Sequence, residues 1–193
     1  MIFTNAITKE AIAKMPKEEF PGRIVIVNTE KELNEAISYL SSFTEIGFDT
    51  ETRPNFSKNS HHKMALMQLS SIDACFLIRL NKFKNMPVAL RSFLINKDVK
   101  KIGLSLRDDF HGLLNLTNLT PGNFIDLQQY VKQFGIEDMS LQKIYAILFG
   151  KKISKRNRLS NWETVVLTAP QIHYAALDAW SCLRIYQFLE RSR

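Results

Sequence analysis

The run Ile46-Gly47-Phe48-Asp49-Thr50-Glu51 places two carboxylates two residues apart in a mostly apolar segment. Side chains alternate along a strand, so Asp49 and Glu51 are expected to point to one face of a sheet. Neighbouring carboxylates repel each other unless a cation lies between them, and Mg²⁺ prefers oxygen ligands. The pair therefore indicates a divalent-metal site. A strand end that carries two solvated acids is the plainer interpretation of these residues alone.

A second candidate group lies in the run 171–179 (QIHYAALDA), within an expected last helix. Tyr174 and Asp178 are four residues apart and are therefore neighbours on one helical face. The three alanines of this run allow the helix to approach a sheet closely. Such an approach would bring Asp178 up to Asp49 and Glu51. A solvated tyrosine–aspartate pair is the alternative interpretation.

A third group follows an expected strand that passes through Gly103. Asp108 and Asp109 fall in the first turn of the helix predicted over 106–116, where acids commonly complement the helix dipole. On a helix these two side chains point about 100° apart, so only one of them can face a given site.

In this order and spacing, the three groups resemble the DEDD superfamily of 3′→5′ exonucleases, in its tyrosine-bearing branch, which includes ribonuclease D and the Werner syndrome exonuclease domain. The family's first motif, Asp-x-Glu, matches Asp49 and Glu51, and its third, Tyr-x-x-x-Asp, matches Tyr174 and Asp178. The second motif, an aspartate shortly after a strand-ending glycine, matches Asp109 rather than Asp108.

Two supporting strings, 65–69 (ALMQL) and 159–162 (LSNW), also match the family pattern, and the resemblance covers roughly residues 24 to 190. It implies a metal-dependent exonuclease that hydrolyses DNA or RNA from the 3′ end to nucleoside 5′-monophosphates. Two divalent ions, Mg²⁺ or Mn²⁺, are the implied cofactors. Their implied ligands are Asp49, Glu51, Asp109 and Asp178, and Tyr174 is expected to orient the attacking water.

Two other functions stay open at this point. One is a non-catalytic nucleic-acid-binding module on the same fold, and the other is an enzyme restricted to short oligonucleotides or nucleotides. The sequence contains all four acids and Tyr174, which favours the exonuclease. It leaves DNA and RNA equally open as substrates, and it indicates no oligomeric state.

The charge of the chain agrees with a polyanionic partner. Lysine and arginine number 26 against 19 aspartates and glutamates, which gives a net charge of +7. The densest basic run, 151–158 (KKISKRNR), has five bases in eight residues and lies shortly before the third motif. Such a run is usually only solvated, but its position favours contact with phosphate. The candidate nucleic-acid contacts are Arg53, Phe56, Lys151, Lys152, Lys155, Arg156 and Arg158.

The elements that must position these residues follow from hydrophobic periodicity and turn signals. Strands are predicted over 23–27, 45–51, 64–70, 74–80, 101–104 and 123–126. Helices are predicted over 9–14, after a capping box at 29–32, and over 88–94, 106–116, 127–134 and 141–149, with a last one opening at 168. Three or four meander strands followed by βα units predict an α/β fold, a ribonuclease-H-like mixed sheet flanked by helices.

The length of 193 residues suits one domain, with residues 1–22 as an N-terminal extension and 23–190 as a catalytic core. Cys75 and Cys182 are expected to be small core residues, because two cysteines cannot form a disulfide framework. A reducing, cytoplasmic location is therefore expected. The chain contains no uninterrupted apolar run of about 18 to 20 residues, so no membrane partner is expected. The N-terminus lacks the pattern of a secretory signal.

Overall fold

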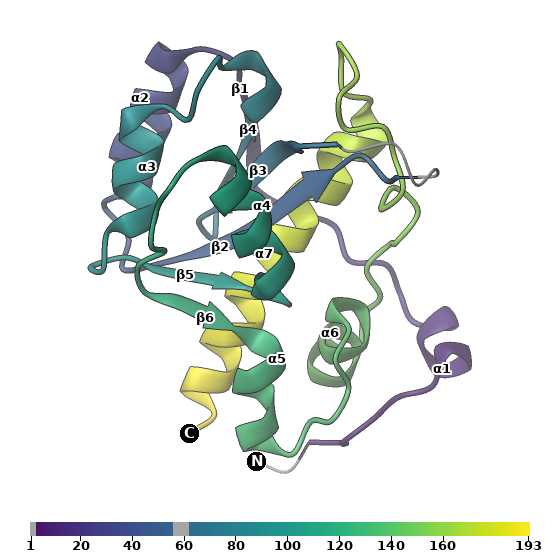
Figure 1. The fold of residues 1–193 in the computed structure, drawn as a ribbon. Coiled ribbons are helices and arrows are strands. Elements are labelled where there is room, and N and C mark those ends of the chain that lie inside the picture. The colour runs from purple at the N-terminus through teal and green to yellow at the C-terminus, as the bar shows by residue number, and fades with distance from the viewer. Residues whose placement is uncertain (1–2, 56–61) are drawn as a thin grey trace.

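The computed structural model describes residues 3–55 and 62–193, in which one six-stranded mixed sheet lies between two layers of helices (Figure 1). The strand order across the sheet is β1-β4-β3-β2-β5-β6, which places β2 near the centre. The strands are β1 (Arg23–Val27), β2 (Glu45–Thr52), β3 (Met64–Ser70), β4 (Ala74–Arg79), β5 (Lys100–Gly103) and β6 (Phe124–Asp126).

The strand directions confirm the predicted succession of an antiparallel meander and βα units. Strands β2, β3 and β4 form the meander, and β5 and β6 then add parallel to β2. The meander has three members, because β1 runs parallel to β4 at the edge of the sheet. The helix between β1 and β2 returns the chain to its starting side, so these two strands run in the same direction.

The helices divide between the two faces of the sheet. One face is covered by α2 (Glu30–Leu40), α3 (Val88–Ile95) and α4 (Leu106–Leu116), whose apolar residues share a core with Phe48, Met67 and Leu69 of the sheet. The long helix α7 (Ala169–Arg191) crosses the other face, and α5 (Leu127–Tyr130) and α6 (Leu141–Phe149) pack beside it (Figure 1). The short α1 (Lys9–Ala13) lies next to α6.

The segment 127–134, which the sequence predicts as one helix, differs in detail. It is α-helical only over Leu127–Tyr130 and continues as a 3₁₀ helix over Val131–Phe134. Gly135, at a φ of 75°, ends it in the left-handed conformation, and a tightened last turn before such a residue is common. A second 3₁₀ turn spans Leu80–Lys82 after β4.

Helix α7 lies unusually close to β2. Thr168 caps the helix, as the run Thr-Ala-Pro-Gln predicts, and the structure adds a reciprocal capping box with Gln171. Ala175, Ala176 and Ala179 are fully buried against the sheet. A Cβ added to Gly47 would lie 1.9 Å from the carbonyl oxygen of Ala179, so no side chain fits between this strand and this helix.

The segment before β1 packs against the α6–α7 side of the molecule. Phe20 contacts the Trp180 ring at 5.6 Å between centroids, and Ile12 is buried. The backbones of Lys17 and Lys152 form a parallel β-bridge, which joins this segment to the start of the basic run 151–158. Within the described part of the chain, no helix has both the length and the apolar character that crossing a membrane requires.

Candidate active site

Three carboxylates meet where β2 passes under α7. Asp49 and Glu51 point to the same face of β2, and Asp178 reaches them from the helix. One oxygen of each lies within 4.8 Å of the others. The two-residue spacing on the strand and the small residues of α7 together produce this cluster. The structure thus brings together three of the four metal ligands that the sequence suggests.

The cluster is electrostatically unfavourable without a cation. Burial, followed by the charges of Asp178 and Asp109, raises the pKa of Asp49 well above its ordinary range. Burial and the neighbouring carboxylates raise the pKa of Glu51 to about 10. Burial raises the pKa of Asp178 to about 7, although the Tyr174 hydroxyl and Lys155 act in the opposite direction. Buried oxygen donors that cannot all ionise together fit a divalent cation such as Mg²⁺ or Mn²⁺.

Asp109 and Asp108, adjacent in sequence, have different surroundings. Asp109 lies against β2, where its carboxylate accepts a hydrogen bond from the Thr50 hydroxyl on the face opposite Asp49. Burial raises the pKa of Asp109 to about 6. Its oxygens are outside the three-acid cluster. Asp108 is exposed at a shallow cavity of about 660 Å³ with Arg107 and His111. Of the two aspartates, only Asp109 faces β2.

Tyr174 is buried, which excludes the alternative of a solvated tyrosine–aspartate pair. Its side chain is 7% exposed and lies one helical turn before Asp178. Its ring packs against Trp162 with centroids 6.0 Å apart, and Trp162 is itself fully buried. Burial and the charges of the neighbouring acids raise the pKa of the phenol, so Tyr174 keeps its proton at neutral pH. It can therefore donate a hydrogen bond inside the site.

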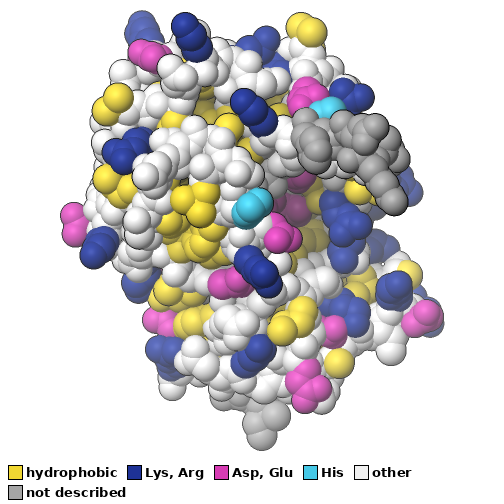
Figure 2. All heavy atoms as spheres, in the orientation of Figure 1, with side chains coloured by type: hydrophobic (Ala, Val, Ile, Leu, Met, Phe, Trp, Pro, Cys, Tyr) yellow, Lys and Arg dark blue, Asp and Glu magenta, His cyan; other side chains and the backbone are white. Residues whose placement is uncertain are grey.

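The acids and Tyr174 open into a cavity of about 320 Å³ that also contains basic groups. Lys155 and Arg158 line this cavity, and so do Ser140 and Leu141 at the N-terminal end of α6. Figure 2 shows Lys and Arg side chains gathered beside a hollow in which acidic side chains are visible. Cationic groups and a helix N-terminus next to carboxylates suit an anion that approaches a bound metal.

The other basic residues of the run 151–158 do not line this cavity. The Lys151 ammonium pairs with Glu18 at 3.0 Å, and the Lys152 ammonium donates to the carbonyl of Ala13. Both residues are held by the segment before β1 and lie outside the cavity lining. Arg156 is exposed beside the cavity residues Lys155 and Arg158.

The two predicted contacts after the first motif do not join the cavity. Arg53 is exposed and pairs with Glu163 at 3.3 Å, and His62 contacts the same carboxylate at 3.0 Å. Glu163 follows Trp162, so these contacts connect the segment after β2 to the segment before α7. Phe56, the other predicted contact, lies outside the described residues.

Gln68 was not among the predicted site residues, although it lies directly across from Asp49 in the β2–β3 ladder. Its side chain is fully buried, and neither of its amide atoms has a hydrogen-bond partner among the described residues. The signal in the sequence was a single glutamine in the otherwise apolar strand 64–69 (MALMQL).

The mixed sheet with helices on both faces is a ribonuclease-H-like fold, and its carboxylates meet where α7 crosses β2. The chain belongs to the 3′-5′ exonuclease family, whose family model matches residues 24–192.

Curated relatives and solved structures agree with this assignment. The chain is 33% identical over 184 residues to the mouse protein named bifunctional 3′-5′ exonuclease/ATP-dependent helicase WRN, covering 91% of this chain and 13% of that protein. It is 32% identical over 178 residues to exonuclease 3′-5′ domain-containing protein 2 of Drosophila melanogaster, covering 88% of this chain and 30% of that protein. This chain thus spans less than a third of the length of either relative.

Two solved structures share the fold. The exonuclease domain of Nibbler from Aedes aegypti superposes with a TM-score of 0.80 at 24% identity, covering 90% of this chain and 91% of that one. Ribonuclease D of Escherichia coli superposes with a TM-score of 0.77 at 21% identity, covering 88% of this chain and 46% of that one.

Proposed function

We propose that this protein is a metal-dependent 3′→5′ exonuclease of the tyrosine-bearing DEDD branch, which removes nucleoside 5′-monophosphates from the 3′ end of a nucleic acid. The observation that carries the proposal is the meeting of Asp49, Glu51, Asp178 and Tyr174 in one cavity. Membership of the exonuclease family supports the direction of attack. The proposal treats residues 1–22 as an extension of the same domain.

Asp49, Glu51 and Asp178 would hold the divalent ions, and the resemblance to the DEDD family adds Asp109, whose carboxylate here accepts the hydrogen bond of Thr50. Their fit rests on the donor set, since one buried and two half-buried carboxylates, all with raised pKa values, lie within reach of one ion. When bound, a pair of such ions stabilises charge on the attacking and leaving oxygens of an in-line displacement.

The side chains of the protein would supply the orientation. The Tyr174 hydroxyl, protonated and buried beside Asp178, would hold the attacking water in line with the scissile bond. Lys155 and Arg158 would neutralise the phosphates of the terminal nucleotides, and the free N–H groups at the start of α6 would add to this field. Binding and alignment of the 3′ end are thus the tasks of the cavity wall.

The test uses 5′-labelled single- and double-stranded DNA and RNA, incubated with Mg²⁺, with Mn²⁺ or with EDTA. Stepwise shortening from the 3′ end, release of nucleoside 5′-monophosphates and arrest by EDTA are the expected results. Asp178→Asn and Asp49→Asn should abolish shortening while the fold, followed by circular dichroism, is kept. Binding without shortening in the wild type would instead indicate a non-catalytic nucleic-acid-binding module. Shortening of dinucleotides alone would indicate an enzyme for short oligonucleotides.

A further inference from the structure

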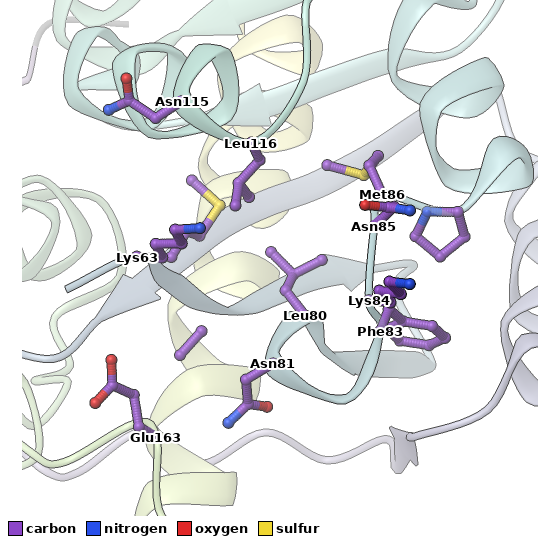
Figure 3. Close-up of a pocket in the computed structure, with 13 residues that line it drawn as sticks. Lys63, Leu80, Asn81, Phe83, Lys84, Asn85, Met86, Asn115, Leu116 and Glu163 are labelled. Atoms are coloured by element: carbon purple, nitrogen blue, oxygen red, sulfur yellow. The ribbon is translucent and has the colours of Figure 1, made fainter.

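A further cavity, of about 590 Å³, lies apart from the active site and shares no lining residue with it. Its floor is the start of β3 at Met64 and Ala65. The segment 80–87 after β4 forms one wall, and the end of α4, at Asn115 and Leu116, forms another. Figure 3 shows Lys63 and Leu116 facing the segment that carries Phe83, Lys84 and Asn85, with Glu163 at the lower end.

The lining of this cavity combines three kinds of group. Its apolar side chains include Leu80, Phe83 and Leu116. Three amide side chains, Asn81, Asn85 and Asn115, form no hydrogen bond with any residue that the structure describes. The ammonium groups of Lys63 and Lys84 likewise form no ion pair with the described residues.

The charge of the cavity favours an anion. Its single lining acid, Glu163, is already held by Arg53 and His62, at 3.3 and 3.0 Å. Two exposed lysines therefore face the cavity without a neutralising partner among the described residues. Apolar and aromatic surface for a base, amides for base edges and ammonium groups for phosphate are together the chemistry that binds an unpaired nucleotide.

Two residues that line this cavity lie close to active-site residues through sequence or strand pairing. Met64 pairs with Thr52, the neighbour of Glu51 in β2. Glu163 follows Trp162, whose ring packs against Tyr174. Met64 and Glu163 thus connect the lining of this cavity to the surroundings of the active site.

We propose that this cavity is a subsite for an unpaired nucleotide of the substrate strand, upstream of the 3′ end. This inference rests on the proposed function, because it assigns the far part of the same substrate. The base lies against Phe83 and Leu116, and Lys63 and Lys84 hold the flanking phosphates. The cavity then contributes to long substrates and not to those that end before they reach it.

The experiment compares the double variant Lys63→Gln/Lys84→Gln with the matched control Lys82→Gln/Lys97→Gln. Lys82 belongs to the same segment 80–87 but lies outside this cavity, and Lys97 is exposed beyond α3. For a single-stranded 12-mer, kcat/KM should fall about 5- to 20-fold through KM in the cavity variant, with the control within about 2-fold. Hydrolysis of a dinucleotide should stay unchanged. An equal loss of kcat/KM on the 12-mer and the dinucleotide, or in the cavity and control variants, overturns the proposed subsite.

A binding measurement separates this inference from the proposed function. The affinity of a fluorescent 12-mer, followed by anisotropy in the Asp178→Asn background, requires no hydrolysis. The affinity for the 12-mer should fall about 5- to 20-fold in the cavity variant and stay unchanged in the control variant. If the wild type proves inactive, the proposed function fails while this difference still decides the subsite. Equal affinity of cavity variant and control overturns it.

An independent observation concerns Gln68. A fully buried amide whose oxygen and nitrogen both lack partners is costly, so native proteins usually satisfy such a group. Directly opposite residues of an antiparallel pair have Cβ atoms about 4.5–5.5 Å apart, and here the opposite residue is Asp49. On the other side of Gln68 the ladder neighbour is Leu77, which offers no polar atom on its side chain.

We infer that Gln68 is a positioning residue, whose amide donates to an oxygen of the Asp49 carboxyl group and fixes its orientation for a metal. This inference also rests on the proposed function. Replacing a residue that hydrogen-bonds to a metal ligand, without itself touching the metal, typically lowers metal affinity by 10- to 100-fold. The fully buried position of Gln68 excludes a direct contact with substrate.

The test replaces the amide by an apolar side chain of similar length, Gln68→Met, with Leu77→Met as the control on the neighbouring strand. Calorimetric affinity for Mg²⁺ should fall about 10-fold in Gln68→Met and stay within about 2-fold in Leu77→Met. Unchanged Mg²⁺ affinity in Gln68→Met overturns the inference, whatever happens to stability. A double-mutant cycle with Asp49→Ala, which leaves no acceptor for the Gln68 amide, gives a readout in metal-free thermal unfolding. Additive effects there overturn the inference as well.

Discussion

Asp108 and Asp109 show how one residue position decides between surface and site. Asp109 is held by Thr50 against β2, and Asp108 is exposed on the other side of the helix. Asp109→Asn should therefore reduce hydrolysis by about 100-fold or more, whereas Asp108→Asn should change it by less than about 3-fold. Steady-state kinetics on one labelled oligonucleotide would measure both. The reverse ranking would shift the second motif by one residue.

Tyr174 and Asp178 share a helical face but differ in what they supply. Tyr174→Phe keeps the ring on Trp162 and removes only the hydroxyl, so the rate should fall about 10- to 1000-fold with substrate binding retained. Asp178→Asn removes a proposed metal ligand and should cost more activity. Calorimetric metal affinity should survive the first substitution and drop in the second. Equal loss of metal binding would make Tyr174 a structural residue.

At the scale of elements, the contact of α7 with β2 fixes where Asp178 lies. Gly47→Ala would place a methyl group 1.9 Å from the Ala179 carbonyl oxygen, so the helix must move and Asp178 with it. We expect a lower melting temperature and a loss of activity of about 100-fold or more. Gly112→Ala in α4 is the control, because its methyl group would meet only the flexible end of Met64, at 2.9 Å.

The control substitution has an expected sign of its own. Alanine is favoured over glycine within a helix by roughly 0.5–1 kcal/mol, so Gly112→Ala should leave activity and melting temperature nearly unchanged or raise the latter. Thermal unfolding and kinetics of both variants would measure the contrast. If Gly47→Ala were as active as the control, the close contact would have no part in placing the site.

Most of the elements that carry the site could be predicted from the sequence, because their signals are local. Alternation gives the face shared by Asp49 and Glu51, and the helix cap at Thr168 gives the start of α7. Pairing at a distance has no local signal. The pairing of β1 parallel to β4 at the edge of the sheet joins segments far apart in sequence, and so does the ion pair between Lys151 and Glu18. Gln68 is missed for the same reason, because strand register decides that Asp49 lies directly across from it.

At the scale of the whole molecule, the acid cluster should make stability depend on pH. The pKa values of Glu51, about 10, and Asp178, about 7, lie above those of the unfolded chain. The folded protein therefore holds protons that the unfolded chain has released, and the corresponding stability is lost as pH rises through the folded pKa values. The metal-free protein should melt at a lower temperature at pH 8 than at pH 5.5.

The measurement is thermal unfolding in EDTA from pH 5.5 to 8, where acids with lowered pKa values, such as Glu32, are already ionised in both states. A fall of about 3 °C or more is expected, since roughly 1 kcal/mol corresponds to 2–4 °C for a chain of this size. Asp178→Asn should flatten the dependence, and Mg²⁺ should raise the melting temperature most at pH 8. A flat profile in the wild type would contradict the electrostatic account of the cluster.

The segment before β1 shows that the family model and the contacts of the fold draw the boundary of this domain at different places. The family match begins at residue 24, whereas Phe20 covers Trp180 and the backbone of Lys17 is bridged to Lys152. A shorter chain that began at residue 24 would expose the aromatic ring of Trp180 in α7. It would also remove the β-bridge between Lys17 and Lys152, which holds the start of the basic run that contains Lys155 and Arg158. For recombinant work, the smallest unit worth expressing is therefore defined by contacts and begins well before the first residue of the family match.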